Sequence, residues 1–201
     1  MATAEELTVK SLGPCRIDSP IRGMIESRST SAHYVDVADR VYFYDTKQLA
    51  EASGLALDAL PGFEPAGPRK QIFFDGAKMR VGIVTCGGLC PGINDVVRGI
   101  VMELTFHYGV KRIYGFRNGY QGFIPRYSHD VVDLSPAVVS DINEVGGTIL
   151  GTSRGGQDSD EIVDCLERMN INALFVIGGD GTLRGAMQIA EVVAARNQKI
   201  A

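Results

Sequence analysis

The sequence lacks the features that mark several specialised classes of protein. Its longest unbroken apolar runs fall far short of the roughly 18 residues that a membrane-spanning helix needs, so no membrane helix is predicted. It has no basic stripe and a net charge of −4, which argues against a general nucleic-acid surface. Its N-terminal segment, MATAEELTVKSLGPC, lacks the apolar centre of a signal peptide and is acidic early, unlike a transit peptide. An apolar content of 45% then indicates an ordinary soluble protein with a buried core.

Cysteines and histidines are also few, and neither type forms a recognisable site. The four cysteines are too few in 201 residues for a disulfide framework, so reduced thiols and a cytoplasmic location are expected. Cys86 and Cys90 have a spacing that zinc ligands often show, but no second pair and no nearby histidine accompanies them. The three histidines show no metal-binding or acid–base spacing. No zinc site is therefore predicted.

The chain divides into two zones of different texture. Residues 1–78 are irregular and punctuated by prolines, and they are predicted to form an N-terminal extension. One short helix at Lys47–Ala52 and short strands near 41–44 and 72–74 are expected within it. Residues 79–201 alternate apolar strand patterns with amphipathic helix patterns and are predicted to form a second, regular domain.

The regular zone predicts an α/β fold. Strands are expected at 79–85, Arg112–Phe116, 131–134 and Ala173–Ile177, the last being the most buried, and another strand begins at 199–201. Residues 148–151 are expected to be short and extended. Helices are expected after a first-turn Pro91, from Ser135-Pro136 to just before Gly146, at 160–169 and at 183–196. The last helix is expected to face inward with Ala186, Met187, Ile189, Ala190 and Val193. This order implies a mostly parallel sheet with helices on both faces.

Glycines are abundant and clustered. The chain has 24 glycines in 201 residues, about 12%, against a usual share of roughly 7%. They gather in loops that follow Val84, Ile149 and Ile177. Ligands of open parallel sheets bind outside the carboxyl ends of the strands, and paired glycines allow a backbone to approach a ligand closely. These three loops are therefore where a functional site is expected.

The first two loops each leave two interpretations open. The first contains Gly87-Gly88 between a strand and a helix, a geometry that offers backbone N–H groups and a positive helix end to an anion. It matches neither G-x-G-x-x-G nor the Walker A pattern, so a tight turn without a ligand remains the alternative. The second places Arg154 beside Gly155-Gly156, where a guanidinium suits a phosphate group. A plain surface arginine is the alternative.

The third loop, Gly178 to Thr182, is the most informative. It follows the apolar strand ALFVI and enters a helix, which would hold Asp180 at the carboxyl edge of the sheet. A carboxylate there suits magnesium against nucleotide phosphates, directly or through water. Gly181 and Gly185 would leave room for phosphates and ribose, and Thr182 would cap the helix and donate to a phosphate oxygen. The alternative is that Asp180-Gly181 is only a turn signal.

Three motifs carry a resemblance to a known family. GGLCPGIN (87–94), GGTILGTSR (146–154) and ALFVIGGDGTLRGA (173–186) resemble the N-terminal signatures of the phosphofructokinases, in order and spacing. The leader, with AGPRKQIFFD (66–75), is similar to the plant-type, ATP-dependent 6-phosphofructokinase branch. G-G-D-G-T is shared with NAD kinases and diacylglycerol-type lipid kinases, but the two upstream motifs exclude those relatives.

The resemblance implies a glycolytic kinase that uses ATP to phosphorylate the 1-hydroxyl of fructose 6-phosphate. It implies a cytoplasmic homo-oligomer when complete, Mg²⁺ bound at Asp180, and ATP bound by Gly88, Arg154, Gly155, Gly179, Asp180, Gly181, Thr182 and Gly185. Pyrophosphate-using members typically carry Asp at the position of Gly181, where a carboxylate would crowd and repel the α-phosphate of ATP. Gly181 therefore favours ATP as donor over pyrophosphate. Tyr120 and Phe123 either approach the adenine or pack their own loop.

The resemblance also implies which part of the reaction this sequence does not carry. The family's catalytic base is an aspartate in a T-I-D-N-D motif, which is expected beyond Ala201, so no catalytic residue is assigned. The chain is therefore expected to be a fragment, a splice product or a truncated gene model, and to be inactive alone. Its residues 79–201 are expected to form an incomplete nucleotide-binding domain. The alternatives are a non-catalytic partner of full-length subunits, a pyrophosphate-dependent enzyme, and a nucleotide-binding module without transfer chemistry.

Overall fold

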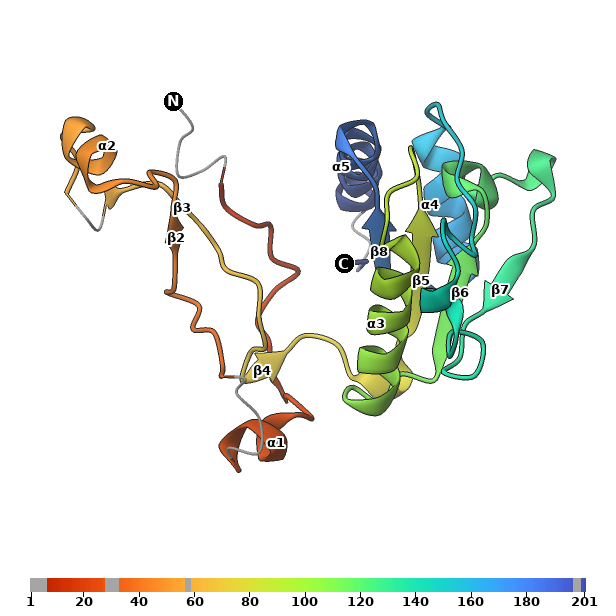
Figure 1. Cartoon of the computed structure of the whole chain (residues 1–201), viewed down its shortest axis with the longest axis horizontal. Helices are drawn as coiled ribbons and strands as arrows, with labels where there is room; N and C mark the ends of the chain where they lie inside the picture. The colour runs from red at the N-terminus through yellow and green to blue at the C-terminus, as the bar shows by residue number, and fades with distance from the viewer. Residues whose placement is uncertain (1–6, 28–32, 57–58, 197–199) are drawn as a thin grey trace. The chain divides into compact units, whose positions relative to one another are not determined.

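The computed structural model describes residues 7–27, 33–56, 59–196 and 200–201. It divides into two compact units, residues 1–73 and 74–201, which are described separately below (Figure 1). The strand expected at 199–201 begins at a residue outside the described ranges. No helix in the described ranges is long and apolar enough to cross a lipid bilayer.

The first unit contains two small antiparallel strand pairs. β1 (Ile17–Asp18) pairs with β4 (Gln71–Ile72), and β2 (Val41–Tyr42) pairs with β3 (Gly62–Phe63). Both strands expected from the sequence are thus present, but each is only two residues long. Strands this short contribute few ladder hydrogen bonds, so they guide the path of the chain more than they stabilise it.

Two short helices complete this unit. α1 spans Arg22–Glu26, and α2 spans Lys47–Ala52 as the sequence predicts. Thr46 caps α2, since its hydroxyl oxygen accepts a hydrogen bond from the Leu49 amide at 3.3 Å. The buried apolar core described for this unit contains Ile21 and Ile25.

The second unit is built on a four-stranded sheet in the order β7-β6-β5-β8. Its strands are β5 (Arg80–Thr85), β6 (Arg112–Phe116), β7 (Val131–Asp133) and β8 (Ala173–Ile177). β5 pairs in parallel with both β6 and β8, whereas β7 joins β6 in the antiparallel sense. The prediction of a mostly parallel sheet is confirmed.

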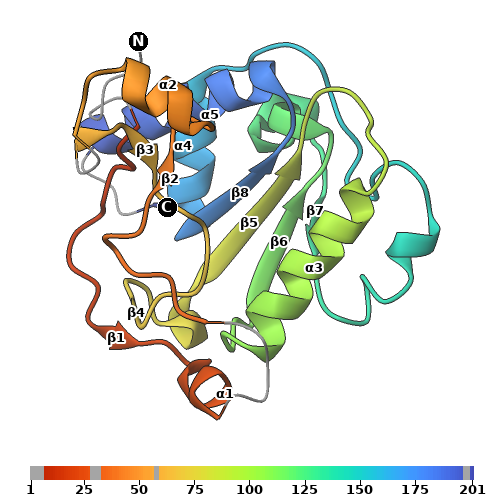
Figure 2. The ribbon, with the colours of Figure 1, turned by 60° about the vertical axis from the view of Figure 1, so that its left-hand side comes forward.

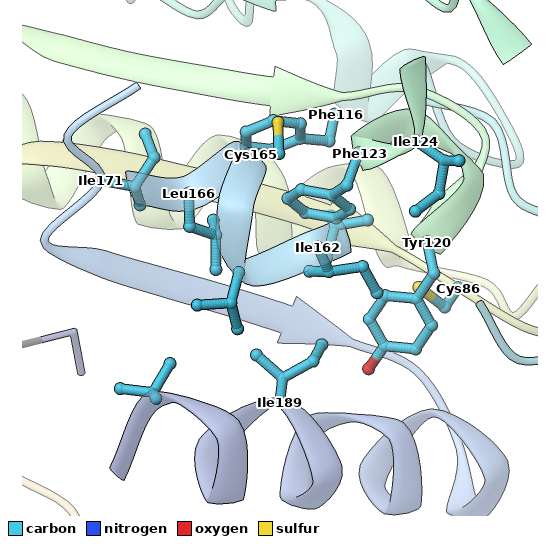
Figure 3. Packing of buried hydrophobic residues seen from close by; sticks show 13 residues of the cluster. Cys86, Phe116, Tyr120, Phe123, Ile124, Ile162, Cys165, Leu166, Ile171 and Ile189 are labelled. Carbon is cyan, nitrogen blue, oxygen red and sulfur yellow. The ribbon is translucent and has the colours of Figure 1, made fainter. Parts of the chain in front are cut away.

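Helices cover both faces of this sheet (Figure 2). α3 (Ile93–Phe106) lies on one face, and α4 (Ser159–Arg168) and α5 (Asp180–Ala195) lie on the other. The side chains of β5 alternate accordingly, because successive strand residues point to opposite faces. Val81 and Ile83 join the buried cluster that contains Val97 and Val101 of α3. Val84 joins the opposite cluster, where Ile162, Leu166 and Ile189 come from α4 and α5 (Figure 3).

The helix expected after Ser135-Pro136 does not form. The Ser135 hydroxyl accepts a hydrogen bond from the Val138 amide at 3.4 Å, but the segment continues as turns and ends in a single 3-10 turn, η5 (Ile142–Glu144). Asp141 has left the helical region, with φ −118° and ψ 6°. β-Branched valines, Ser and Asp are weak helix formers, and burial of Val139 in the core decides the path of the segment instead.

Two local predictions near the loops are also wrong. Residues 148–151 are not extended, because the Gly151 amide donates to the Thr148 carbonyl at 3.1 Å and closes a turn with Gly151 at φ +66°. Pro91 does not occupy the first turn of α3, whose N-cap is Gly92 at φ +87°. In both places a left-handed glycine redirects the backbone where the sequence pattern suggested a regular element.

The burial of the last strand and helix differs from the prediction. β8 is an edge strand of the described sheet, and Phe175 on it remains 37% exposed, whereas β5 in the centre is the most buried strand. α5 begins at Asp180 rather than at Leu183. Ile189 and Val193 face the core as expected, but Met187 is 65% exposed and Ala190 is exposed too. The free flank of β8 is contacted at one point in the described ranges, where the Leu174 amide donates to the Ala201 carbonyl at 2.8 Å and the Ala201 amide donates to the Asn172 carbonyl at 2.9 Å.

Candidate functional site

The first and third glycine loops meet because β5 and β8 are adjacent parallel strands. Both strands end at the same edge, and the Cys86 amide donates to the Ile177 carbonyl at 2.8 Å where β5 gives way to its loop. The connection from β5 through α3 runs to β6 on one side, while β8 lies on the other side of β5. This is a topological switch point, the place where open α/β sheets bind ligands.

The second loop reaches the same edge without following a strand. The Thr85 hydroxyl donates to the Gly151 carbonyl at 2.7 Å and lies 3.0 Å from the hydroxyl oxygen of Thr148. The Gly87 amide donates to the Ser153 carbonyl at 3.3 Å, and the Thr152 hydroxyl donates to the Gly87 carbonyl. These bonds fasten the loop that carries Arg154 against the Gly87-Gly88 turn.

Asn94 holds the other end of this loop. It is 2% exposed at the start of α3, and its side-chain amide donates to the Val145 carbonyl at 2.8 Å. Its side-chain oxygen accepts a hydrogen bond from the Ile149 amide at 2.9 Å. Asn94 lies in the first motif, but the sequence prediction gave it no role. Its place inside the motif was a signal in the sequence, but its burial, which makes polar partners necessary, is seen only in the structure.

A pocket of about 470 Å³ opens where the three loops meet. Every residue assigned from the sequence lines it, namely Gly88, Arg154, Gly155, Gly179, Asp180, Gly181, Thr182 and Gly185. Polar residues that the sequence prediction did not assign line it as well, including Ser153, Gln157, Arg184 and Gln188. The Ser153 hydroxyl is buried and has no hydrogen-bond partner within the described part of the chain.

The amino end of α5 is open toward the pocket. The N-cap is Gly179, which has no side chain, and no side-chain hydrogen bond caps the helix. Thr182 therefore does not cap α5, contrary to the prediction. It lies in the first turn, 6% exposed, and packs against Gly178 at the turn that enters the helix. The first-turn amides of Asp180, Gly181 and Thr182 have no intrahelical acceptor, and with the helix dipole they form an anion-binding end.

Charged side chains flank this helix end. Asp180 is the first residue of α5 and is exposed at the pocket. Arg154 and Arg184 are exposed on the pocket wall, and neither forms an ion pair with any residue that the structure describes. Two cations beside open amides make the pocket suited to a multiply charged anion.

The two aromatic side chains of the 118–123 segment have different surroundings. Phe123 is fully buried and stacks on Phe116 with ring centroids 4.0 Å apart, so it belongs to the core. Tyr120 lines the pocket, and its ring lies beside Cys86 (Figure 3). Burial raises the pKa of the Cys86 thiol to about 11, and burial, followed by the neighbouring Cys86, also raises the pKa of the Tyr120 hydroxyl. Both groups are therefore protonated at neutral pH.

The fold and the pocket place the chain in a broad class. It is an α/β protein with an open, mostly parallel sheet and a glycine-lined pocket at the carboxyl ends of the central strands. The family model described as "Phosphofructokinase" matches residues 80–197. The chain belongs to the phosphofructokinase family, as its three motifs predict.

Curated relatives agree with this assignment. The chain is 50% identical over 197 residues to the "ATP-dependent 6-phosphofructokinase" of Amycolatopsis methanolica, and this match covers 98% of the chain and 43% of the relative. It is 46% identical over 196 residues to the protein of the same name from Borreliella burgdorferi, with the same two coverages. "ATP-dependent 6-phosphofructokinase 7" of Arabidopsis thaliana is 49% identical over 139 residues, 69% of the chain and 28% of the relative. The chain thus spans less than half the length of these relatives.

Solved structures confirm the fold. A pyrophosphate-dependent phosphofructokinase from Marinobacter aquaeolei matches with a TM-score of 0.54 and 17% identity, over 61% of this chain and 32% of that one. Phosphofructokinase from Pichia pastoris in the T-state matches with a TM-score of 0.53 and 21% identity, over 60% of this chain and 13% of that one. At these identities the likeness concerns the fold alone.

Proposed function

We propose that this chain provides the Mg²⁺-ATP half of a 6-phosphofructokinase active site. The observation that carries the proposal is the pocket, in which all the residues assigned from the motifs meet at the uncapped amino end of α5. The names of the relatives, all ATP-dependent 6-phosphofructokinases, supply the substrate class. The reaction proposed for the complete enzyme is transfer of the γ-phosphoryl group of ATP to the 1-hydroxyl of fructose 6-phosphate.

The phosphate chain is assigned to the amides and cations of the pocket. The free first-turn amides of α5 and the Gly87-Gly88 turn present backbone donors, and Arg154 presents a guanidinium. The buried Ser153 hydroxyl, which has no partner in the described ranges, supplies one more donor. Gly181 supports ATP over pyrophosphate as the donor. No atom lies within 4 Å of the position that a Cβ would take at Gly181, so an aspartate there would fit the protein and its carboxylate would extend into the pocket space that the phosphates of ATP need.

The residues present also fit magnesium. The described residues contain no cluster of three or more potential metal ligands, so a closed protein cage is not available for the ion. Mg²⁺ in phosphoryl-transfer sites is typically held by one or two carboxylates, with phosphate oxygens and water completing the octahedron. Asp180 is exposed at the pocket and is the one acidic side chain in its described lining. When bound, the ion would neutralise charge on the transferring phosphate.

A half-site of this kind binds and orients the nucleotide. Asp180 and the amide donors would fix the phosphates, and orientation is a large part of catalysis in phosphoryl transfer. The proton of the sugar hydroxyl needs a base, and the magnesium role of Asp180 leaves that task to another group. We therefore expect the 201-residue chain to bind Mg²⁺-ATP without catalysing fructose 6-phosphate-dependent ADP release, and a coupled assay on the purified chain tests this.

Calorimetric titration with ATP, with and without Mg²⁺, tests the half-site directly. We expect Mg²⁺ to tighten ATP binding by the wild-type chain, and Asp180→Ala to weaken that Mg²⁺-dependent binding by about 10- to 100-fold. Asp95→Ala is the matched control, because Asp95 is an exposed acidic residue in the first turn of α3 and lies outside the pocket. Equal Mg²⁺-ATP affinity for wild type and Asp180→Ala would remove Asp180 from this role. No ATP binding by the wild type would refute the half-site itself.

A further inference from the structure

Tyr120 connects the 118–123 segment to the helix end that forms the pocket. Its hydroxyl donates a hydrogen bond to the Thr182 carbonyl at 2.7 Å, across 62 residues of sequence. Figure 3 shows the ring between Cys86 and Ile162, with its oxygen directed toward α5. The side chain is 6% exposed, so the bond is shielded from water and is stronger than a surface hydrogen bond.

The backbone before Tyr120 is shaped to direct the ring inward. Asn118 and Gly119 are both left-handed, with φ of 57° and 62°, and they turn the chain sharply after β6. The Asn118 amide donates to the Leu150 carbonyl at 2.8 Å, which fixes this turn against the second loop. Tyr120 is thus held from one side by the loop that carries Arg154 and bonded on the other side to α5.

Gly185 supplies the second contact between the ring and α5. A Cβ at Gly185 would lie 2.7 Å from the ring carbon Cε2 and 3.2 Å from the hydroxyl oxygen. Only glycine therefore allows the ring to lie directly on the helix. From the motif, Gly185 is explained by the space that a ligand needs. In the structure, the space beside its Cα is occupied by the ring of Tyr120.

These contacts act on the part of α5 that binds the phosphates in the proposed function. Thr182 is in the first turn, and the amides that open toward the pocket belong to Asp180, Gly181 and Thr182 itself. A bond to the Thr182 carbonyl, together with packing one turn later at Gly185, restrains the direction of this turn. Helix ends without caps otherwise fray easily.

We propose that Tyr120 is a positioning residue that holds the first turn of α5 in its phosphate-binding geometry through its hydroxyl bond to Thr182 and its ring contact with Gly185. The inference rests on the proposed function for the identity of the ligand, but the restraint on α5 exists without any ligand. It assigns to Tyr120 an action through the helix, rather than stacking on the base of the nucleotide. The raised pKa of its hydroxyl keeps the donor protonated.

Tyr120→Phe tests the hydroxyl bond in the 201-residue chain without nucleotide. The Thr182 carbonyl keeps its place in the helical hydrogen-bond pattern, so no buried group is left without a partner and the variant is expected to fold. We expect hydrogen exchange of the amides at 183–186, which bond to the carbonyls of the helix start, to become about three- to ten-fold faster, since one shielded hydrogen bond is lost. Tyr127→Phe is the matched control, because Tyr127 is 37% exposed and outside the pocket. Unchanged exchange at 183–186 in Tyr120→Phe would overturn the proposal.

Binding of ATP and adenosine separates positioning from a direct contact with the base. We expect Tyr120→Phe to weaken Mg²⁺-ATP binding by about three- to ten-fold while adenosine binding changes less than two-fold, because only ATP uses the first-turn amides. Equal losses for both ligands would place Tyr120 against the nucleoside and overturn the positioning role. If Tyr120→Phe does not fold, Gly185→Ala, whose Cβ forces the ring off the helix, should show the faster exchange at 183–186 instead. If the wild type does not bind ATP, the proposed function fails, and the exchange measurement still decides the role of Tyr120.

Discussion

Replacing Asn94 by alanine is the sharpest test of how the site is assembled. The change removes both hydrogen bonds by which one buried side chain joins α3 to the second loop, at 2.8 and 2.9 Å. Each intramolecular hydrogen bond contributes about 0.5–1.5 kcal/mol, and a buried group left without a partner costs about 1–3 kcal/mol. The Val145 carbonyl and the Ile149 amide both lose their partner, so a loss of about 2–4 kcal/mol in the free energy of unfolding is expected.

The loss should be accompanied by a local effect at the pocket. Asn94 fixes residues 145–149, which lead directly into the loop that carries Arg154, so hydrogen exchange in 146–154 should accelerate more than in α4. Urea unfolding followed by circular dichroism measures the stability, and Asn143→Ala is the matched control, since Asn143 is an exposed asparagine on η5 beside the same loop. If the two variants lose the same stability, within about 0.5 kcal/mol, the bridging role of Asn94 is wrong.

Two further changes test the electrostatics of the pocket. The Cys86 thiol has its pKa raised by burial from 9.0 to about 11, so its contribution to stability is fully present below pH 9 and is lost as the pH rises toward 11. At 1.36 kcal/mol per pKa unit, wild type should lose about 2–3 kcal/mol more than Cys86→Ala across this range in pH-dependent urea unfolding, and parallel curves would contradict the assignment. Gly181→Asp should fold normally, because nothing lies within 4 Å of the added Cβ, yet weaken ATP binding. A carboxylate about 4 Å from a phosphate charge costs between about 1 and 4 kcal/mol depending on solvent exposure, so calorimetry should show at least a five-fold loss. Gly99→Asp, at an exposed helical glycine on α3 with similarly open surroundings, is the control, and equal ATP affinity for both variants would remove the argument from Gly181.

Local patterns predicted the elements whose burial is decided locally. The apolar runs of β5, β6 and β8 and the spacing of α3 and α4 agree with the structure, because a strand or helix that buries one face must show the period of that face. The segment after Ser135 shows the opposite case. Its proline and serine resemble a helix start, but burial of Val139 against the sheet outweighs a weak local preference. Propensity loses to tertiary packing when the segment is short and its residues are poor helix formers.

The site was predictable as a set of residues and not as an arrangement. The second loop was expected to follow a strand, whereas it is a turn held by Thr85 and Asn94 from 66 and 55 residues away. Such long-range bonds leave no periodic trace in the sequence. Tyr120 has the same character, since its partner lies 62 residues further on. The motifs locate backbone donors because glycine clusters are local, but the side chains that fix those donors come from elsewhere.

Two helices begin at this pocket, and their different ends indicate which one faces an anion. α4 has Asp158 as N-cap, whose carboxylate accepts hydrogen bonds from the amides of Asp160 and Glu161, so its own acidic side chains satisfy its positive end. α5 has a glycine N-cap and Arg184 just after its first turn, where a cation opposes the helix dipole. With Arg154 on the facing wall, two guanidinium groups and one carboxylate, that of Asp180 in the first turn, flank the open amides of α5. Open amides beside two guanidinium groups are best satisfied when a multiply charged anion lies between them, whereas the α4 end, already capped by a carboxylate, has no such need.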